Sequence, residues 1–361
     1  MSLPNTNMAT HQKKHVVRFD LWIDPIFDAR LTQESDIALS VSSLSARDEA
    51  AWAALEQAHV YHISPARNEL PERWQAHDAL LARCPQLLCV SSGGAGHDTV
   101  DVEACTRAGV AVVNQIGGNA RSVAEHTLGL ILAVSRRIAE SDRKLRRERG
   151  FTRESVMGHE ISEKVLGLVG IGHAGRQVAS LAHAFGMRVI AFDPLLAPEE
   201  IRARGAVPVD FGRLLAESDV VSLHCPRDAT TIGMFSADAF GRMKQHAIFI
   251  STARGGIHDE IDLAGALRSG HLAGAGLDVW DPEPPALGHP LLAMDNVVAT
   301  YHTAGVSHEG RRNVARIAAE QIVQLLRGEQ PQRLVNPEVW PLFQERYQAL
   351  IGPAQIQGAT Q

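Results

Sequence analysis

Short apolar runs recur along the chain, and stretches with helical periodicity separate most of them. In the second half these runs are nearly continuous in Val, Ile and Leu, which is typical of strands covered on both faces. The expected strands there are Val165–Val169, Arg188–Phe192, Val220–His224, Ala247–Ser251, Gly274–Val279 and Val297–Tyr301. Strands that alternate with helices in this way predict an α/β fold with a doubly wound parallel sheet.

The first part of the chain shows the same alternation. The expected strands are Val16–Ile23, His59–Ser64, Leu87–Val90 and Val110–Val113, and the expected helices are Ala46–Gln57 and Asp101–Ala108. A long helix from Ser122 to about Ile138, capped by Asn119 or Ser122, leads into the second sheet, and a helix at Arg311–Leu326 leads back. We therefore expect a discontinuous first domain of residues 16–120 and 311–352, a second domain of residues 121–310, and loose termini at 1–15 and 353–361.

Composition narrows the possible classes of protein. The chain has 361 residues, more than one compact core usually holds, and 45% of them are apolar. The net charge is −6, and the one charge-dense stretch, Arg143–Arg153, mixes both signs, so we expect a solvated connector and no nucleic-acid partner. Cys84, Cys89, Cys105 and Cys225 lack metal-binding spacing and are expected to be reduced thiols, with no metal site. No signal peptide or membrane-spanning run is apparent, which predicts a cytoplasmic protein without a membrane partner.

A glycine fingerprint follows the strand expected at 165–169. Gly170, Gly172 and Gly175 have the G-x-G-x-x-G spacing between a strand and a helix, and Asp193 follows the next strand. Gly170 can adopt the backbone angle of a tight turn, Gly172 lets the main chain approach a pyrophosphate, and Gly175 lets the helix pack closely. A carboxylate at 193 would accept hydrogen bonds from ribose hydroxyls and repel a 2′-phosphate, so the expected cofactor is NAD. The alternative is a glycine-rich turn in a different kind of α/β protein.

Three polar side chains, Arg254, Glu283 and His302, stand at the carboxyl ends of expected strands in the same domain. Open parallel sheets bind ligands at that edge. Reduction of a ketone requires a proton donor that titrates near neutral pH, and a histidine beside a carboxylate meets this need. Arginine can pair with the carboxylate of a 2-oxo acid and polarise its carbonyl. Each residue alone is more often structural, but together they predict hydride-transfer chemistry.

The chain resembles the D-isomer-specific 2-hydroxyacid dehydrogenase family in these three residues and in several further sequence blocks. The blocks are Gly96–Asp101, Gly118–His126, the glycine fingerprint, Thr252–Gly256, Gly274–Val279, Glu283–Pro284 and His302–Gly305. The resemblance extends from Leu87 to Trp340. It implies a flavodoxin-like substrate domain, a Rossmann NAD-binding domain, and a homodimer built around the long helix near Ser122.

The resemblance also implies a role for each candidate residue. Arg254 would bind the substrate carboxylate and carbonyl, His302 would donate and accept the proton, and Glu283 would be its partner. Asp278 would contact the nicotinamide amide. The residues implied at the cofactor are Gly170, Gly172, His173, Ala174, Gly175, Asp193, Cys225, Thr252, Ala253, Asp278 and Gly305. Those implied at the substrate are Ser92, Gly93, Gly94, Asn119 and Arg254, and the N–H groups of the glycine-rich loop at 92–96 can cradle an anion.

Departures from the family's usual pattern bear on the substrate, a small 2-oxo acid or D-2-hydroxy acid. Tyr301 stands where proline is usual and Ser251 where asparagine is common, but neither change removes a catalytic group. Ser92 stands where phosphoglycerate dehydrogenases often have arginine, which favours a substrate of the hydroxypyruvate or glyoxylate type over 3-phosphoglycerate, although Arg121 offers another positive charge. The alternative function is an NAD(H)-sensing, corepressor-like binding protein, which long interaction arms would favour; this chain shows only short polar ends.

Overall fold

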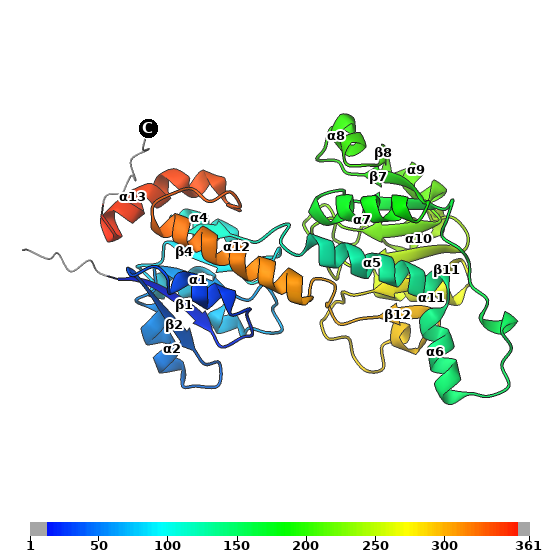
Figure 1. Ribbon diagram of the computed structural model, residues 1–361, viewed down its shortest axis with the longest axis horizontal. Helices are drawn as coiled ribbons and strands as arrows, with labels where there is room; N and C mark the ends of the chain where they lie inside the picture. Colours follow the sequence, from blue (N-terminus) through cyan, green and yellow to red (C-terminus); the bar gives the residue numbers. More distant parts are fainter. Residues whose placement is uncertain (1–12, 353–361) are drawn as a thin grey trace, which may run out of the picture. The chain divides into compact units, whose positions relative to one another are not determined.

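The computed structural model describes residues 13–352, which form two compact units. One unit comprises residues 13–118 and 311–352, and the other comprises residues 119–310. Each unit is built on a wholly parallel sheet (Figure 1). The strand order is β2-β1-β3-β4-β5 in the first sheet and β12-β11-β10-β9-β6-β7-β8 in the second. The predicted α/β fold with two doubly wound parallel sheets is confirmed.

Helices cover both faces of the first sheet. Its strands are β1 (Lys14–Phe19), β2 (Ile37–Ser42), β3 (Val60–Ile63), β4 (Cys89–Ser92) and β5 (Ala111–Val113). The helices are α1 (Ile26–Leu31), α2 (Asp48–Leu55), α3 (Asp78–Arg83), α4 (Val102–Arg107), α12 (His308–Leu326) from Arg311 onward and α13 (Trp340–Leu350), with 3-10 turns at Glu72–Trp74 and Pro337–Val339. Successive strand residues face opposite ways: Val16 packs with α1, α12 and α13, and Val17 packs with α2, α3 and α4.

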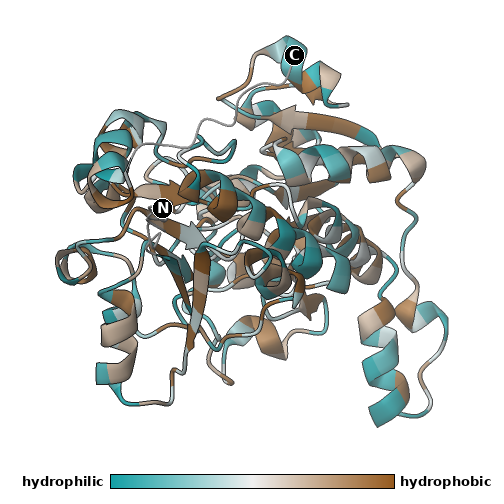
Figure 2. Ribbon diagram, turned by 60° about the vertical axis from the view of Figure 1, so that its left-hand side comes forward, coloured by the Kyte–Doolittle hydropathy of each residue, from teal (hydrophilic) through white to brown (hydrophobic). Residues whose placement is uncertain are grey.

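The second sheet is also covered on both faces. Its strands are β6 (Val165–Val169), β7 (Arg188–Phe192), β8 (Val207–Pro208), β9 (Val220–Leu223), β10 (Ala247–Ser251), β11 (Leu272–Leu277) and β12 (Val297–Ala299). The helices are α5 (Ala120–Ser135), α6 (Ile138–Arg147), α7 (His173–Ala184), α8 (Pro198–Ala203), α9 (Phe211–Glu217), α10 (Ala237–Arg242) and α11 (Glu260–Arg268), with 3-10 turns at Glu154–Val156 and Pro290–Ala293. Helices α5 and α7 pack on one face and α9, α10 and α11 on the other. The helices are therefore amphipathic, with hydrophilic and hydrophobic residues alternating along them (Figure 2).

Some elements lie where the sequence predicts them and others do not. The observed bounds of β6, β7 and β10 are those predicted, because these strands are wholly or largely buried and their apolar runs are continuous. Strand β2 was missed because it is an edge strand whose sequence, Ile-Ala-Leu-Ser-Val-Ser, is mostly half-exposed. Strand β8, which has two residues, and helix α13 were also missed.

Two predictions about polar segments require correction. The charge-dense stretch from Arg143 is not a connector throughout, since it begins inside α6. Pairs one turn apart, such as Arg146 with Asp142 at 2.9 Å, suit a helix surface. Lys14 and His15 were expected to be loose but pair with β2, whereas residues 1–12 and 353–361 lie outside the described residues.

Among residues 13–352, no helix is long and apolar enough to cross a membrane. These residues also contain no group of three or more His, Cys, Asp or Glu placed to hold a metal ion.

Candidate active site

The glycine fingerprint forms a tight turn between β6 and α7. Gly170 has a φ of 87°, in the left-handed region, and a Cβ there would lie 2.9 Å from the Cys225 backbone nitrogen. A Cβ on Gly175 would lie 2.4 Å from the Gly170 carbonyl oxygen, so the helix could not pack as it does. A Cβ on Gly172 would meet nothing within 4 Å. The turn is therefore closely packed against the protein at Gly170 and Gly175 and has free space beside it at Gly172.

The open side of this turn fits the pyrophosphate of a dinucleotide. Gly172 caps α7 without a side-chain hydrogen bond, so no cap side chain competes with a ligand for the N–H groups of the first turn. Asp193, at the end of β7, accepts hydrogen bonds from the Ile171 N–H (3.0 Å) and the Leu195 N–H (3.1 Å). Its carboxylate is therefore fixed beside the turn, where the sequence predicts ribose recognition. Burial raises the pKa of the Cys225 thiol to about 11, so this side chain is neutral at physiological pH.

His302 and Glu283 form a hydrogen-bonded pair. Glu283 Oε2 lies 2.9 Å from His302 Nδ1, and Glu283 Oε1 accepts the Trp280 N–H at 3.0 Å. The Glu283 side chain is 18% exposed and that of His302 is 38% exposed. No residue from 13 to 352 contacts His302 Nε2 through a hydrogen bond, so the second ring nitrogen is available to a ligand.

Arg254 lies close enough to this pair to affect its charge. Burial by itself raises the pKa of Glu283, but the hydrogen bond and charge of His302, the Trp280 N–H and the charge of Arg254 together lower it below the ordinary value. Glu283 is therefore ionised at neutral pH. A Cβ on Gly255 would lie 2.0 Å from the Trp280 carbonyl oxygen, so the Arg254 turn packs directly on the Glu283 turn. The three predicted catalytic residues thus come together within one unit.

Asp278 shapes the loop that carries His302. Its side chain is fully buried, and its oxygens accept the N–H groups of Thr303 (2.8 Å) and Ala304 (2.9 Å) and the Thr300 hydroxyl (2.6 Å). The Asp278 carbonyl accepts the His302 N–H at 2.6 Å, and His302 has a φ of 47°. This carboxylate is directed to the histidine loop, and the contact with nicotinamide that the sequence predicts stays a prediction.

A second carboxylate–imidazole pair, missed in the sequence, anchors the Glu283 loop. Buried Glu260, the first residue of α11, accepts the Asp281 N–H at 2.8 Å and lies 2.8 Å from His289 Nε2. The His289 ring packs edge-on against the Trp280 indole, with centroids 5.7 Å apart. Burial raises the pKa of Glu260 above its ordinary value. An acid in the first turn of a helix is common, so nothing in the sequence distinguishes Glu260 from a solvated residue.

The loop expected to bind the substrate carboxylate differs in part from the prediction. The Ser92 hydroxyl is buried and donates to the Gly96 carbonyl at 2.6 Å, so it closes the loop and does not face a ligand. The Gly93 N–H donates to the Ile63 carbonyl at 2.7 Å and is not free to bind an anion. The N–H groups of Gly94 and Ala95 have no hydrogen-bond partner among residues 13–352 and remain available.

The remaining predicted residues line the same edge of the second sheet. The Thr252 hydroxyl lies 3.1 Å from that of Thr127 on α5, and the Ala253 carbonyl accepts the Arg254 guanidinium at 2.7 Å. Gly305 makes room for Asn119, whose Nδ2 would lie 2.3 Å from a Cβ at that position. His173 and Ala174 are the first residues of α7.

Comparison with known proteins agrees with this geometry. The family model described as "D-isomer specific 2-hydroxyacid dehydrogenase, NAD binding domain" matches residues 128–304. A D-3-phosphoglycerate dehydrogenase of Archaeoglobus fulgidus is 41% identical over 256 residues, which are 71% of this chain and 48% of the relative. A glyoxylate reductase of Korarchaeum cryptofilum is 35% identical over 290 residues, 76% of this chain and 87% of the relative. The crystal structure of the TT0316 protein from Thermus thermophilus has a TM-score of 0.78 at 31% identity and covers 89% of this chain and 99% of its own.

The chain belongs to the D-isomer-specific 2-hydroxyacid dehydrogenase family, and residues 128–304 of its second unit are the family's NAD-binding domain. The predicted family and the predicted cofactor, NAD, are confirmed. The chain spans about half the length of the phosphoglycerate dehydrogenases it matches. Because the relatives carry the names of different substrates, membership of the family leaves the substrate open.

Proposed function

We propose that the chain is an NAD(H)-dependent D-2-hydroxyacid dehydrogenase that reduces a small 2-oxo acid of the hydroxypyruvate or glyoxylate type. The observation that supports this most strongly is the 2.9 Å contact between His302 Nδ1 and Glu283. It fixes the imidazole while leaving Nε2 available for proton transfer. Arg254, on the adjoining turn, provides the planar cation that suits a carboxylate beside a carbonyl.

Arg254, His302 and Glu283 have separate roles in the proposed reaction. When bound, NADH supplies the hydride that reduces the carbonyl carbon. Arg254 pairs with the substrate carboxylate and polarises the carbonyl oxygen, and protonated His302 donates the Nε2 proton to that oxygen. Ionised Glu283 accepts the Nδ1–H hydrogen bond and stabilises the imidazolium. In the oxidative direction the neutral imidazole accepts the proton of the substrate hydroxyl.

The substrate preference rests on the loop at 92–96. Ser92 is uncharged and so provides no positive charge to pair with a phosphate group, and its hydroxyl donates a hydrogen bond to the Gly96 carbonyl within the loop. We assign the N–H groups of Gly94 and Ala95, in place of that of Gly93, to the substrate carboxylate. Asn119 remains a proposed substrate contact.

Steady-state kinetics with purified protein test the proposal. NADH consumption is measured with glyoxylate and hydroxypyruvate, and NADH formation is measured with 3-phosphoglycerate and NAD⁺. Wild type is compared with His302→Asn and Arg254→Gln, and Arg312→Met, an exposed arginine elsewhere, is the control. We expect both site variants to lose most turnover and to bind NADH as wild type does, because Arg254 and His302 follow β10 and β12, whereas the fingerprint lies between β6 and α7. Turnover of 3-phosphoglycerate alone contradicts the substrate assignment.

We further propose that the protein is a homodimer in which α6 takes part. Three large apolar side chains are exposed on α6 and the segment after it: Ile138 (56%), Leu145 (64%) and Met157 (70%). Exposed apolar groups gathered on one segment favour burial against a partner. Light scattering after size exclusion should give twice the chain mass of 39.1 kDa, and Leu145→Glu should shift the mass toward that of one chain. A monomeric wild type contradicts this proposal.

A further inference from the structure

One face of α5 and its N-cap contacts the histidine loop, residues 300–307, within the second unit. Asn119, Ser122 and His126 are three and four positions apart, so their side chains lie on the same side of the helix. Each of the three meets a residue of the loop: Asn119 lies against Gly305, the Ser122 hydroxyl oxygen is 2.7 Å from that of Ser307, and His126 Nε2 is 3.0 Å from the Thr300 hydroxyl oxygen. Helix α5 therefore contacts the loop on both sides of His302.

The Thr300 hydroxyl connects His126 with Asp278. Its oxygen is 2.6 Å from Asp278 Oδ1, and both carboxylate oxygens of Asp278 also accept backbone N–H groups of the histidine loop. Because a carboxylate in this role only accepts, the one hydroxyl proton lies between Thr300 and Asp278. The hydroxyl oxygen must then accept its other hydrogen bond from His126, which places a proton on His126 Nε2.

Asp278 holds the backbone that carries the His302 ring. Its side chain is fully buried, and its carbonyl accepts the His302 N–H at 2.6 Å. The His302 φ of 47° is in the left-handed region, which is unfavourable for a residue with a side chain and persists where neighbouring contacts hold it. A displacement of Asp278 would therefore move the His302 ring relative to Glu283.

His126 is also a basic group beside this buried carboxylate. Its Nε2 is 3.6 Å from Asp278 Oδ1, and its side chain is 25% exposed. The charged side chains next to it along α5, Arg121 and Glu125, pair with each other at 2.6 Å. The charge that His126 meets directly is therefore that of Asp278.

Loss of the His126 N–H would leave the Thr300 hydroxyl free to turn. The Leu277 carbonyl, 3.4 Å away, is a second acceptor within its reach. A hydroxyl that turned to this carbonyl would deprive Asp278 of its shortest hydrogen bond. The N–H of His126 thus decides which acceptor the hydroxyl serves.

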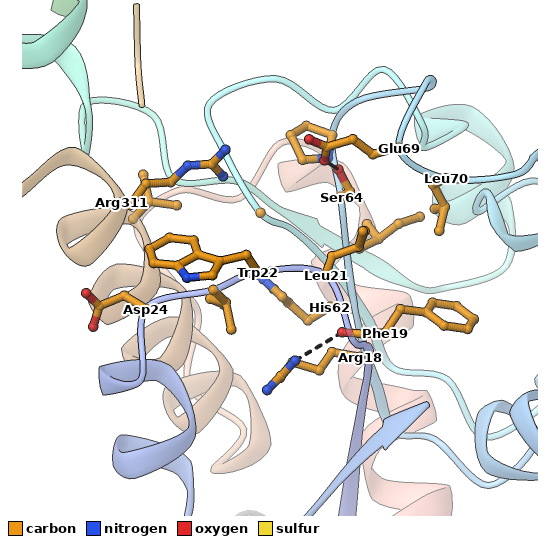
Figure 3. Close-up of a pocket in the computed structure, with 15 residues that line it drawn as sticks. Arg18, Phe19, Leu21, Trp22, Asp24, His62, Ser64, Glu69, Leu70 and Arg311 are labelled. Carbon is orange, nitrogen blue, oxygen red and sulfur yellow. Dashed lines mark hydrogen bonds between the residues drawn. The ribbon is translucent and has the colours of Figure 1, made fainter. Parts of the chain in front are cut away.

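A histidine beside a hydroxyl does not by itself form such an arrangement. In the first unit, His62 Nδ1 lies 3.1 Å from the Ser91 hydroxyl oxygen, and His62 lines the pocket drawn in Figure 3. Within residues 13–352, the Ser91 hydroxyl makes no hydrogen bond to a carboxylate. Burial lowers the pKa of His62 to about 3, so its ring is a neutral part of the core. The buried carboxylate beyond the hydroxyl distinguishes His126 from His62.

We propose that His126 is a positioning residue for proton transfer by His302. Its Nε2–H directs the Thr300 hydroxyl to Asp278, and Asp278 holds the histidine loop so that His302 meets Glu283. The inference rests on the proposed function, in which His302 is the proton donor, and extends it to a residue that acts through this chain of hydrogen bonds.

Steady-state kinetics with glyoxylate compare three variants with wild type. His126→Leu removes the donor, whereas His126→Gln keeps an N–H at a similar position. His183→Leu is the matched control, because His183 is an exposed histidine of α7 whose Nε2 lies 2.7 Å from the Gly205 carbonyl oxygen. We expect His126→Leu to lower kcat about 3- to 10-fold, the equivalent of one hydrogen bond, with KM changed by less than about twofold. His126→Gln and His183→Leu should keep kcat within about twofold of wild type.

Two further readouts separate positioning from a general loss of structure. In His126→Leu, the pH at which reductive turnover falls to half should move to lower pH, because a displaced His302 is less stabilised by Glu283, and His126→Gln should restore it. Hydrogen exchange followed by mass spectrometry reports on the loop without turnover. Peptides that contain Thr303 and Ala304 should exchange faster in His126→Leu than in wild type or His126→Gln, with unchanged exchange in β6 and β10.

The other outcomes contradict the inference. Wild-type kcat in His126→Leu, or wild-type exchange of the loop peptides, overturns it. Equal losses in His126→Gln and His126→Leu overturn the role of the N–H donor, and faster exchange throughout the second unit shows a packing role instead. If wild type turns over no 2-oxo acid, the proposed function fails and the role in proton transfer fails with it. The exchange comparison then still decides whether His126 holds the loop, so the two failures are distinguished.

Discussion

Replacing Glu260 with alanine should destabilise the second unit strongly and impair turnover. Glu260 and His289 are 9% and 15% exposed and lie 2.8 Å apart, so removal of the carboxylate leaves a largely buried imidazole and the Asp281 N–H without their partner. Breaking a buried pair from one side costs about 3–5 kcal/mol. For a unit of this size that corresponds to a decrease in Tm of roughly 6–20 °C. Turnover should fall as well, because the displaced segment at Asp281 adjoins Glu283.

Two control variants isolate the buried pair. Glu260→Gln keeps an acceptor for the Asp281 N–H and a polar side chain of the same size beside His289, so it should lose only a minor part of the stability. Glu217→Ala removes an ion pair of similar length, 2.7 Å to Arg213, but with partners 45% and 54% exposed. Such surface pairs contribute about 0–1 kcal/mol.

Thermal unfolding followed by circular dichroism, together with kcat and the Kd for NADH, measures these effects. The expected order of Tm is wild type, Glu217→Ala, Glu260→Gln and then Glu260→Ala, with NADH binding retained in the folded protein. A Tm for Glu260→Ala within about 1 °C of that of Glu217→Ala would refute the argument, since the two pairs would then contribute alike.

Three further predictions follow from the structure. Glu283→Gln removes the charge that stabilises protonated His302, so the pH at which reductive turnover falls to half should move to lower pH; superimposable profiles would show that Glu283 is not the partner. Burial lowers the pKa of His258 from 6.5 to about 4, so the unfolded chain binds more protons between these values and stability falls as the pH decreases from 6.5 toward 4. The loss due to His258 approaches roughly 3 kcal/mol near pH 4, and urea unfolding at pH 7 and pH 4.5 should show a smaller difference for His258→Leu than for wild type. Gly172→Ala places a methyl in the open space before α7 and should weaken NADH binding without changing Tm, whereas equal loss of both would indicate a packing role.

Local sequence patterns predicted the second unit well. Buried strands such as β6 and β10 have continuous apolar runs, which identify them in the sequence. The turn between β6 and α7 admits only glycine at Gly170 and Gly175, so the spacing of these glycines identifies the turn. Arg254, Glu283 and His302 were found because each follows an apolar run predicted as a strand (β10, β11 and β12), and the carboxyl ends of these parallel strands lie at the same edge of the sheet.

Features that depend on contacts between distant segments were not predicted. Glu260 and His289 are 29 positions apart, and only the fold shows that the carboxylate meets the imidazole beneath the Glu283 loop. The Gly93 N–H was expected to be free for an anion but donates to the Ile63 carbonyl at the end of a neighbouring strand, which is again a contact between distant segments. Edge strand β2 was missed because it has an exposed side and therefore lacks the continuous apolar run of a buried strand.

The central claim is that NADH reduces a small 2-oxo acid on this protein, with Arg254 binding the substrate and His302 donating the proton. The most direct test is NADH consumption by purified wild type and His302→Asn with glyoxylate and hydroxypyruvate, alongside direct measurement of NADH binding. The account predicts turnover by wild type and its near-complete loss in the variant, with similar NADH affinity in both. Tight NADH binding without turnover of any 2-oxo acid by wild type would contradict the account and would favour an NAD(H)-sensing binding protein.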